Sequence, residues 1–170
     1  MTLHPVGVVK SPRKDPSLRF EHGDLRTDSS DPPAKAPGEG VCEVIVYDEY
    51  SDCVEGLEEF SHIIILYWPH LAEEGARDVR KVHPAGQKDM PLVGVFATRS
   101  PVRPNPLCST TVRLLERRGN VLKVQGLDAV DGSPVFDIKP HHPRFDAPGD
   151  VKLAGWMEEL MKRMGTDRDG

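Results

Sequence analysis

Short apolar stretches, separated by polar or proline-containing segments, set the pattern of this chain. Most are rich in β-branched side chains, a composition typical of β-strands. The strands that they predict run from 6 to 10, 41 to 47, 61 to 68, 92 to 98, 110 to 115, 121 to 127 and 135 to 138. The run at 61–68 is the most apolar, which predicts a strand buried on both faces. Gly119 and Asn120 separate two of the later strands and predict a hairpin turn.

Helical periodicity is clearest near the C-terminus. After Asp150, a candidate N-cap, apolar residues recur on one helical face as far as Met164, and Gly165 ends the pattern. One terminal helix and about seven short strands predict a mainly β fold, a small barrel or a sandwich. The absence of regular strand–helix alternation disfavours a doubly wound sheet.

Two polar segments interrupt the strands, at 11–40 and 69–91, and we expect both to be long loops. Residues 54–60 predict a single helical turn. These elements predict a barrel domain over 1–148 that includes the long loop 11–40, a helix over 149–164 packed on it, and a tail over 165–170.

Composition indicates a soluble globular protein of one domain. The 170 residues are 38% hydrophobic and 29% charged, with a net charge of −5 that disfavours a general nucleic-acid binder. The charges are unevenly placed: 39–74 holds ten acidic residues and no Lys or Arg, whereas 77–118 holds nine basic and three acidic residues. This asymmetry indicates either one basic face on an acidic protein or two solvated surfaces without a partner.

The chain contains three cysteines, Cys42, Cys53 and Cys108, without any Cys-x-x-Cys spacing. Such a set predicts reduced thiols in a cytoplasmic protein and no zinc site. Residues 1–5 lack the charged start and apolar core of a secretory signal, and no apolar run approaches the length of a membrane span. We therefore expect a cytoplasmic protein that makes no use of a membrane.

The segment 94–106 is the most informative for chemistry. It carries Arg99 and Arg103 among three prolines, which restrict the backbone and hold the two guanidinium groups in place. Guanidinium groups suit a carboxylate, a phosphate or a nucleotide. The alternative is a proline-rich turn whose two arginines are merely solvated.

A second candidate lies in the strand at 135–138. Asp137 and the following Lys139 lie two residues apart, so an extended chain places them on one face, either as a structural ion pair or as an acid–base element. His70 follows the most apolar strand and is more typical of a packed residue than of a ligand. No ligand spacing supports a metal site, so we predict none. Cys108 has no marked partner base, which favours a packed thiol over a nucleophile.

Four stretches, taken in order, then resemble the TsaA/TrmO family. They read VGVVKSP at 6–12, LEEFSH at 57–62, GVFATRSPVRPNP at 94–106 and LDAVDGSPVFDIKP at 127–140. The resemblance implies a small β barrel that acts as a homodimer and a tRNA methyltransferase that uses S-adenosylmethionine. Its implied reaction is methylation of N6 of N6-threonylcarbamoyladenosine in tRNA.

The resemblance also implies a set of cofactor-binding positions. These are His70, Leu71, Arg99, Leu107, Leu127, Asp128, Ala129 and Val130. An Arg suits the cofactor carboxylate, and Leu107 and Leu127 are expected to flank its adenine. For catalysis we hypothesise that Asp137 removes the N6 proton, while Lys139 or Arg103 stabilises developing negative charge.

Three positions depart from the family pattern. Pro32-Pro33-Ala34 stands where Pro-Arg-Gln is usual, Cys108 replaces a glycine, and His141 replaces an aromatic residue. Two other functions therefore remain open from sequence: a barrel that binds a nucleotide-like ligand without chemistry, and a methyltransferase with a different substrate.

Overall fold

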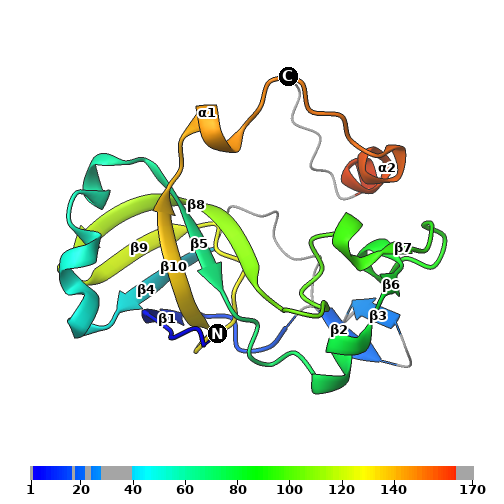
Figure 1. Ribbon diagram of the computed structural model, residues 1–170, viewed down its shortest axis with the longest axis horizontal. Coiled ribbons are helices and arrows are strands. Elements are labelled where there is room, and N and C mark those ends of the chain that lie inside the picture. Colours follow the sequence, from blue (N-terminus) through cyan, green and yellow to red (C-terminus); the bar gives the residue numbers. More distant parts are fainter. Residues whose placement is uncertain (1, 17, 22–23, 28–39, 164–170) are drawn as a thin grey trace.

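Six antiparallel strands close into a barrel in a computed structural model that describes residues 2–16, 18–21, 24–27 and 40–163 (Figure 1). The barrel strands are β1 (Gly7–Lys10), β4 (Val41–Val46), β5 (His62–Tyr67), β8 (Cys108–Arg118), β9 (Val121–Gln125) and β10 (Pro134–Pro140). Their order around the barrel is β1, β10, β5, β8, β9 and β4. The prediction of a mainly β barrel is confirmed, and six of the seven predicted strands coincide with these.

Alternation of side chains builds the barrel core. In β5, Ile63, Ile65 and Tyr67 are buried, whereas Ile64 and Leu66 between them are only half-buried. Successive strand residues point to opposite faces, and the outer face of a single-layer barrel remains open to solvent. The prediction that this strand is buried on both faces was therefore wrong.

Two glycines permit close approach and tight turning. A Cβ on Gly7 would lie 2.5 Å from the carbonyl oxygen of Ile45, so only glycine lets β1 lie this close to β4. The predicted hairpin is confirmed, since Arg118 pairs with Val121 across a two-residue loop in which Gly119 has a φ of +60°.

A smaller unit lies beside the barrel and was largely missed by sequence reasoning. It contains two strand pairs, β2 (Leu18–Glu21) with β3 (Asp24–Thr27) and β6 (Lys81–Val82) with β7 (Val93–Gly94). Three short 3-10 helices complete it: η3 (Glu74–Asp78), η4 (Pro84–Gly86) and η5 (Val95–Ala97). The strand predicted at 92–98 was wrong beyond Gly94, because the chain turns into η5. Leu25, Ala76, Val82 and Val102 form this unit's own buried cluster.

The remaining elements are helical. The turn predicted at 54–60 corresponds to the end of η1 (Asp48–Val54) and to η2 (Leu57–Glu59). The chain leaves the barrel through α1 (Pro143–Asp146). The predicted terminal helix is α2 (Gly155–Arg163), which begins at Gly155, so the predicted N-cap at Asp150 was wrong. Figure 1 shows α2 beside β6 and β7 rather than on the barrel, and Arg163 there pairs with Asp89. Within the described ranges, no helix has the length and apolar character needed to cross a bilayer.

Candidate active site

A cavity of about 740 Å³ opens where β5 ends and β8 begins. The barrel contributes Tyr67 and Cys108, which face each other across these two strands. Phe20 of β2 and Ala76 of η3 contribute the opposite wall from the smaller unit. The volume falls in the range of about 300–1,000 Å³ that is usual for small-molecule sites.

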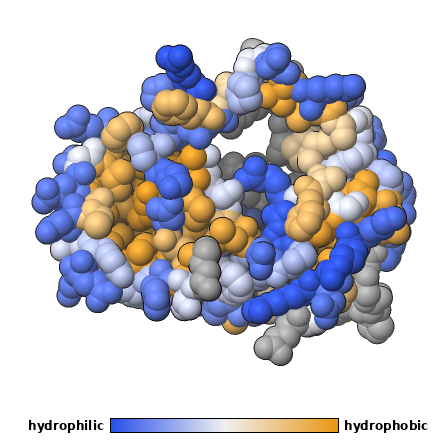
Figure 2. All heavy atoms as spheres, viewed as in Figure 1, coloured by the Kyte–Doolittle hydropathy of each residue, from blue (hydrophilic) through white to orange (hydrophobic). Residues whose placement is uncertain are grey.

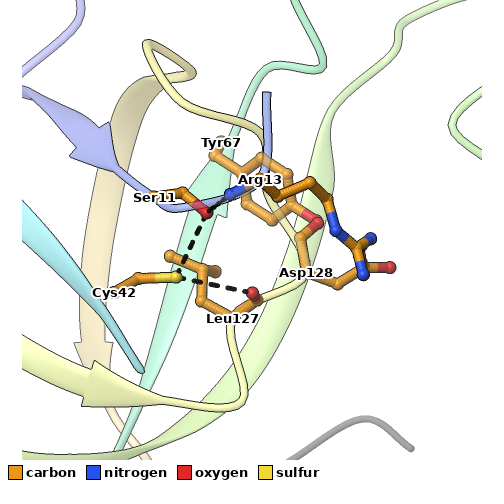
Figure 3. Close-up of polar contacts among 6 residues, drawn as sticks. All are labelled: Ser11, Arg13, Cys42, Tyr67, Leu127 and Asp128. Carbon is orange, nitrogen blue, oxygen red and sulfur yellow. Dashed lines mark hydrogen bonds and ion pairs between the residues drawn. The ribbon is translucent and has the colours of Figure 1, made fainter. Parts of the chain in front are cut away.

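The segment between β9 and β10 forms one side of the cavity and is fixed by the chain that follows β1. Arg13 Nη1 lies 2.6 Å from Asp128 Oδ1, and the buried Tyr67 hydroxyl donates to the carbonyl oxygen of Asp128 (Figure 3). The Ser11 N–H donates to Asp131 Oδ1 at 2.9 Å, and Lys14 Nζ lies 2.6 Å from Asp131 Oδ2. These bonds hold the segment in one conformation across the cavity wall.

Burial sets the protonation of the two groups at the barrel end. It raises the pKa of the Cys108 thiol to about 11, against the opposing effect of Arg103, so the thiol is protonated at neutral pH. It also raises the pKa of Tyr67 above its usual value, which keeps its hydroxyl a neutral donor. Cys108 is therefore a packed thiol, without the thiolate that a nucleophile needs.

The proline-rich loop forms another side and presents both of its arginines. The Thr98 hydroxyl accepts from the Ser100 N–H at 3.2 Å, and the Ser100 hydroxyl accepts from the Val102 N–H at 3.1 Å. Arg99 Nη2 donates to the carbonyl oxygen of Ser109 at 2.8 Å. Serine and threonine turns thus add to proline in fixing the loop, and Val102 anchors it in the buried cluster of the smaller unit.

Seven of the eleven predicted site residues line this cavity. They are Leu71, Arg99, Arg103, Leu107, Asp128, Ala129 and Val130. His70 is exposed beside it, with Nδ1 3.4 Å from the hydroxyl of Ser133, which does line it. Leu127 is different: its side chain packs in the barrel core, so it is not available to flank a ligand. The adjacent Asp128 side chain points away from the core, toward Arg13.

The two predicted catalytic residues of β10 lie elsewhere. Asp137 Oδ2 is 2.5 Å from Lys139 Nζ, and neither residue is part of the cavity lining. Asp137 pairs with Leu66 of β5, and Leu66 pairs with Ser109 of β8, which lines the cavity. Because paired residues share a face, Asp137 lies on the outer face of the barrel, two strands from Ser109.

Several lining residues were missed by sequence reasoning. Arg13, Phe20, Tyr67 and Glu73 reach the cavity from segments interpreted as a loop or as barrel core. Of these, only Arg13 could have been found from the sequence, as a cation three residues after the predicted strand at 6–10. The positions Pro32, Pro33 and Ala34 lie outside the described residues. Among those described, no group of His, Cys, Asp and Glu side chains could hold a metal ion.

The lining can hold a ligand that carries charges of both signs. Arg99 and Arg103 lie on one loop and suit a carboxylate, whereas Asp15 and Glu73 supply carboxylates that suit a cation. The carboxylate of Asp128 is already paired with Arg13. Leu71, Leu107 and Val130 add apolar surface between them.

Comparison with known proteins identifies the family. A profile for the N-terminal domain of tRNA-methyltransferase O matches residues 27–147. The chain belongs to this family. The predicted resemblance to the TsaA/TrmO family is thereby confirmed, and three of the four stretches, from 57 to 140, lie within the matched residues.

Relatives of this family are similar over most of the chain. A protein of Methanothermobacter thermautotrophicus, named a probable S-adenosyl-L-methionine-binding protein, is 46% identical over 147 residues, covering 86% of this chain and 94% of the relative. The Escherichia coli tRNA (adenine(37)-N6)-methyltransferase is 38% identical over 156 residues, covering 88% of this chain and 61% of that enzyme. The crystal structure of TrmO from Pseudomonas aeruginosa superimposes with a TM-score of 0.63 at 27% identity, covering 89% of this chain and 60% of that one. The chain thus spans about three fifths of the bacterial proteins.

Proposed function

We propose that this protein transfers a methyl group from S-adenosylmethionine to N6 of N6-threonylcarbamoyladenosine in tRNA. Its family and the names of its relatives make it an S-adenosylmethionine-dependent methyltransferase of the tRNA-modifying type. The observation that carries the proposal is the mixed-charge cavity, with Arg99 and Arg103 on one loop and the carboxylate of Glu73 also in the lining.

The cavity residues fit the cofactor's chemistry. Arg13 is already paired with Asp128, whereas neither Arg99 nor Arg103 pairs with a carboxylate among the residues that the structure describes. We assign Arg99 to the cofactor carboxylate, with the carboxylates of the lining on its cationic side. Leu71, Leu107, Ala129 and Val130 supply the apolar contacts expected of Leu127.

When bound, S-adenosylmethionine supplies an electrophilic methyl group. The N6 nitrogen forms the new N–C bond as the S–C bond breaks, and the N6 proton must leave to a base. We keep Asp137 as that base, with Lys139 beside it and Arg103 positioned to stabilise negative charge that develops on the carbamoyl oxygen. Proton removal makes an otherwise weak nitrogen nucleophile reactive.

A homodimer would reconcile this role with the position of Asp137. The outer face of β5 and β10 carries the half-buried Ile64, Leu66 and Phe136, and hydrophobic side chains gather over this face in Figure 2. We propose that a second copy of the chain covers this face, so that Asp137 serves a site formed between two protomers. A tRNA substrate also fits a cytoplasmic location, where the three free cysteines would stay reduced.

The test is a comparison of tRNA nucleosides by mass spectrometry. A strain lacking the gene should lose N6-methylated threonylcarbamoyladenosine, and the restored gene should return it, whereas the Asp137→Asn variant should not. A nucleoside profile unchanged by the deletion would refute the proposed substrate.

Asp137 lies outside the cavity, and this observation favours a second candidate function, in which the barrel binds its ligand without transferring a methyl group. In that case the purified Asp137→Asn variant and the wild type would bind S-adenosylmethionine equally, and neither would transfer a methyl group to tRNA. The methyltransferase proposal instead expects equal binding with transfer by the wild type alone.

A further inference from the structure

Two arginines lie against aromatic rings just outside the cavity. Arg77 of η3 places its Cζ atom 5.3 Å from the ring centroid of Trp68, which directly follows β5. Arg103 of the proline-rich loop places its Cζ atom 6.0 Å from the ring centroid of Phe96 in η5. We call these four residues the stacking surface.

The stacking surface is continuous with the cavity. Trp68, Arg77 and Arg103 line a small cleft of about 10 Å³, and Arg103 also lines the cavity itself. Ala72, Glu73, Ala76 and Pro101 are likewise shared between the two. A ligand that extends out of the cavity along this side would meet Trp68, Arg77 and Arg103. Phe96 lines neither hollow and adjoins this path through its contact with Arg103.

Phe96 and Arg77 are the exposed members of this surface, whereas Trp68 and Arg103 are half-buried and Trp68 also packs against Phe136. Phe96 is 76% exposed although it belongs to a loop held by Val95 and Val102, which are buried. Arg77 is also exposed, and among the described residues no carboxylate forms an ion pair with Arg77 or Arg103. An exposed ring with an unpaired guanidinium beside it offers both a stacking face and a positive charge.

We propose that the stacking surface binds unpaired nucleotides of RNA next to the nucleotide that enters the cavity. This inference rests on the proposed function, and it names the part of the tRNA that the site recognises. Unpaired bases stack on aromatic rings and on guanidinium planes, and their phosphates attract arginine. A paired helix buries its base faces, and a peptide of Asp and Glu carries no aromatic base to stack on the rings, so single-stranded RNA fits best.

The experiment measures the binding of a fluorescently labelled RNA hairpin with an open loop of unpaired nucleotides. Phe96→Ala should weaken binding by about 5-fold to 150-fold, the loss expected for one stacked base. Phe145→Ala is the matched control, because Phe145 is 80% exposed on α1 and is absent from the lining of the cavity and the cleft. It should bind the hairpin as the wild type does.

Salt dependence separates stacking from charge. The slope of the logarithm of the RNA-binding constant against the logarithm of salt concentration reports the number of charge contacts. Arg77→Ala should lower this slope by about one unit, whereas Phe96→Ala should leave it unchanged because no charge is removed. Arg118→Ala, which removes an exposed arginine paired with Glu116, should leave the slope nearly unchanged. Calorimetry should give the same S-adenosylmethionine affinity for Phe96→Ala and the wild type.

Three results would overturn the inference. The first is that Phe96→Ala binds the hairpin as tightly as the wild type does. The others are that Phe96→Ala loses as much affinity for a fully paired duplex as for the hairpin, or that binding of an acidic peptide depends on Phe96 to the same degree. The proposed function fails in a different way. A wild-type protein that binds the loop through Phe96 but methylates no tRNA would leave this inference standing and refute the proposed reaction.

Discussion

The two walls of the cavity differ in how the chain builds them. The barrel wall comes from strands joined by continuous ladders around a core that includes Val44, Ile63, Ile65 and Leu122, all fully buried. The opposite wall comes from strands of two to four residues, short 3-10 helices and a buried cluster of four side chains. The barrel wall contains the larger buried core, whereas the fit of the cavity to its ligand depends on both walls.

The largest loss of stability is expected when buried volume is removed from the barrel core. Ile65→Ala deletes a fully buried side chain of β5 and should lower the free energy of unfolding by about 2–5 kcal/mol. Denaturant unfolding followed by circular dichroism measures this loss. Val41→Ala, at a 42% exposed position of β4, is the control and should cost far less. Equal losses would mean that the barrel core does not carry the stability.

A second substitution tests the wall formed by the smaller unit. Val82→Ala removes a fully buried side chain from the cluster of Leu25, Ala76 and Val102, and should cost about 1–3 kcal/mol of unfolding free energy. It should also weaken S-adenosylmethionine binding, because Ala76 and Val102 line the cavity.

The matched control for Val82→Ala is Val124→Ala, which removes the same groups from the barrel core at a position outside the cavity lining. It should lower stability by a similar amount and leave cofactor affinity unchanged. Calorimetric titration of both variants decides the matter, and equal affinities would contradict the claim that the smaller unit shapes the site.

The barrel could be predicted from sequence because its strands carry their own signals. Apolar, β-branched stretches marked six strands, and Gly119 marked the turn between two of them. The smaller unit could not be predicted, because strands as short as Lys81–Val82 leave no periodicity to detect. Its stability comes instead from contacts between residues distant in sequence, such as Leu25 with Val82 and Val102.

The sequence likewise indicated only those parts of the site that carry a local residue pattern. Proline and arginine density revealed Arg99 and Arg103, and both line the cavity. The register of β10 decides where Asp137 lies, and a strand pattern alone does not say which face of a barrel meets a cavity. The same holds at Leu127, whose side chain packs in the barrel core while the adjacent Asp128 lines the cavity.

The smallest effect concerns the bonds that join the first loop to the barrel. Lys14, and then the Ser11 N–H, lower the pKa of Asp131 below its usual value. A carboxyl whose folded pKa is depressed stabilises the fold above its unfolded pKa, and this contribution is lost as the pH falls through the folded pKa. The melting temperature of Asp131→Asn should therefore lie below that of the wild type at pH near 6 and converge with it on acidification. A difference in melting temperature that grows as the pH falls would contradict a stabilising role for the Asp131 carboxylate.

Cofactor binding by the mixed-charge cavity is the central claim, and calorimetric titration with S-adenosylmethionine tests it most directly. The wild type should bind, and Arg99→Ala should bind about 10-fold to 150-fold more weakly, the loss expected for a hydrogen bond between charged groups. Arg118→Ala should bind as the wild type does, because Arg118 is exposed and pairs with Glu116 away from the cavity. Absence of binding by the wild type, or an unchanged affinity in Arg99→Ala, would contradict the account.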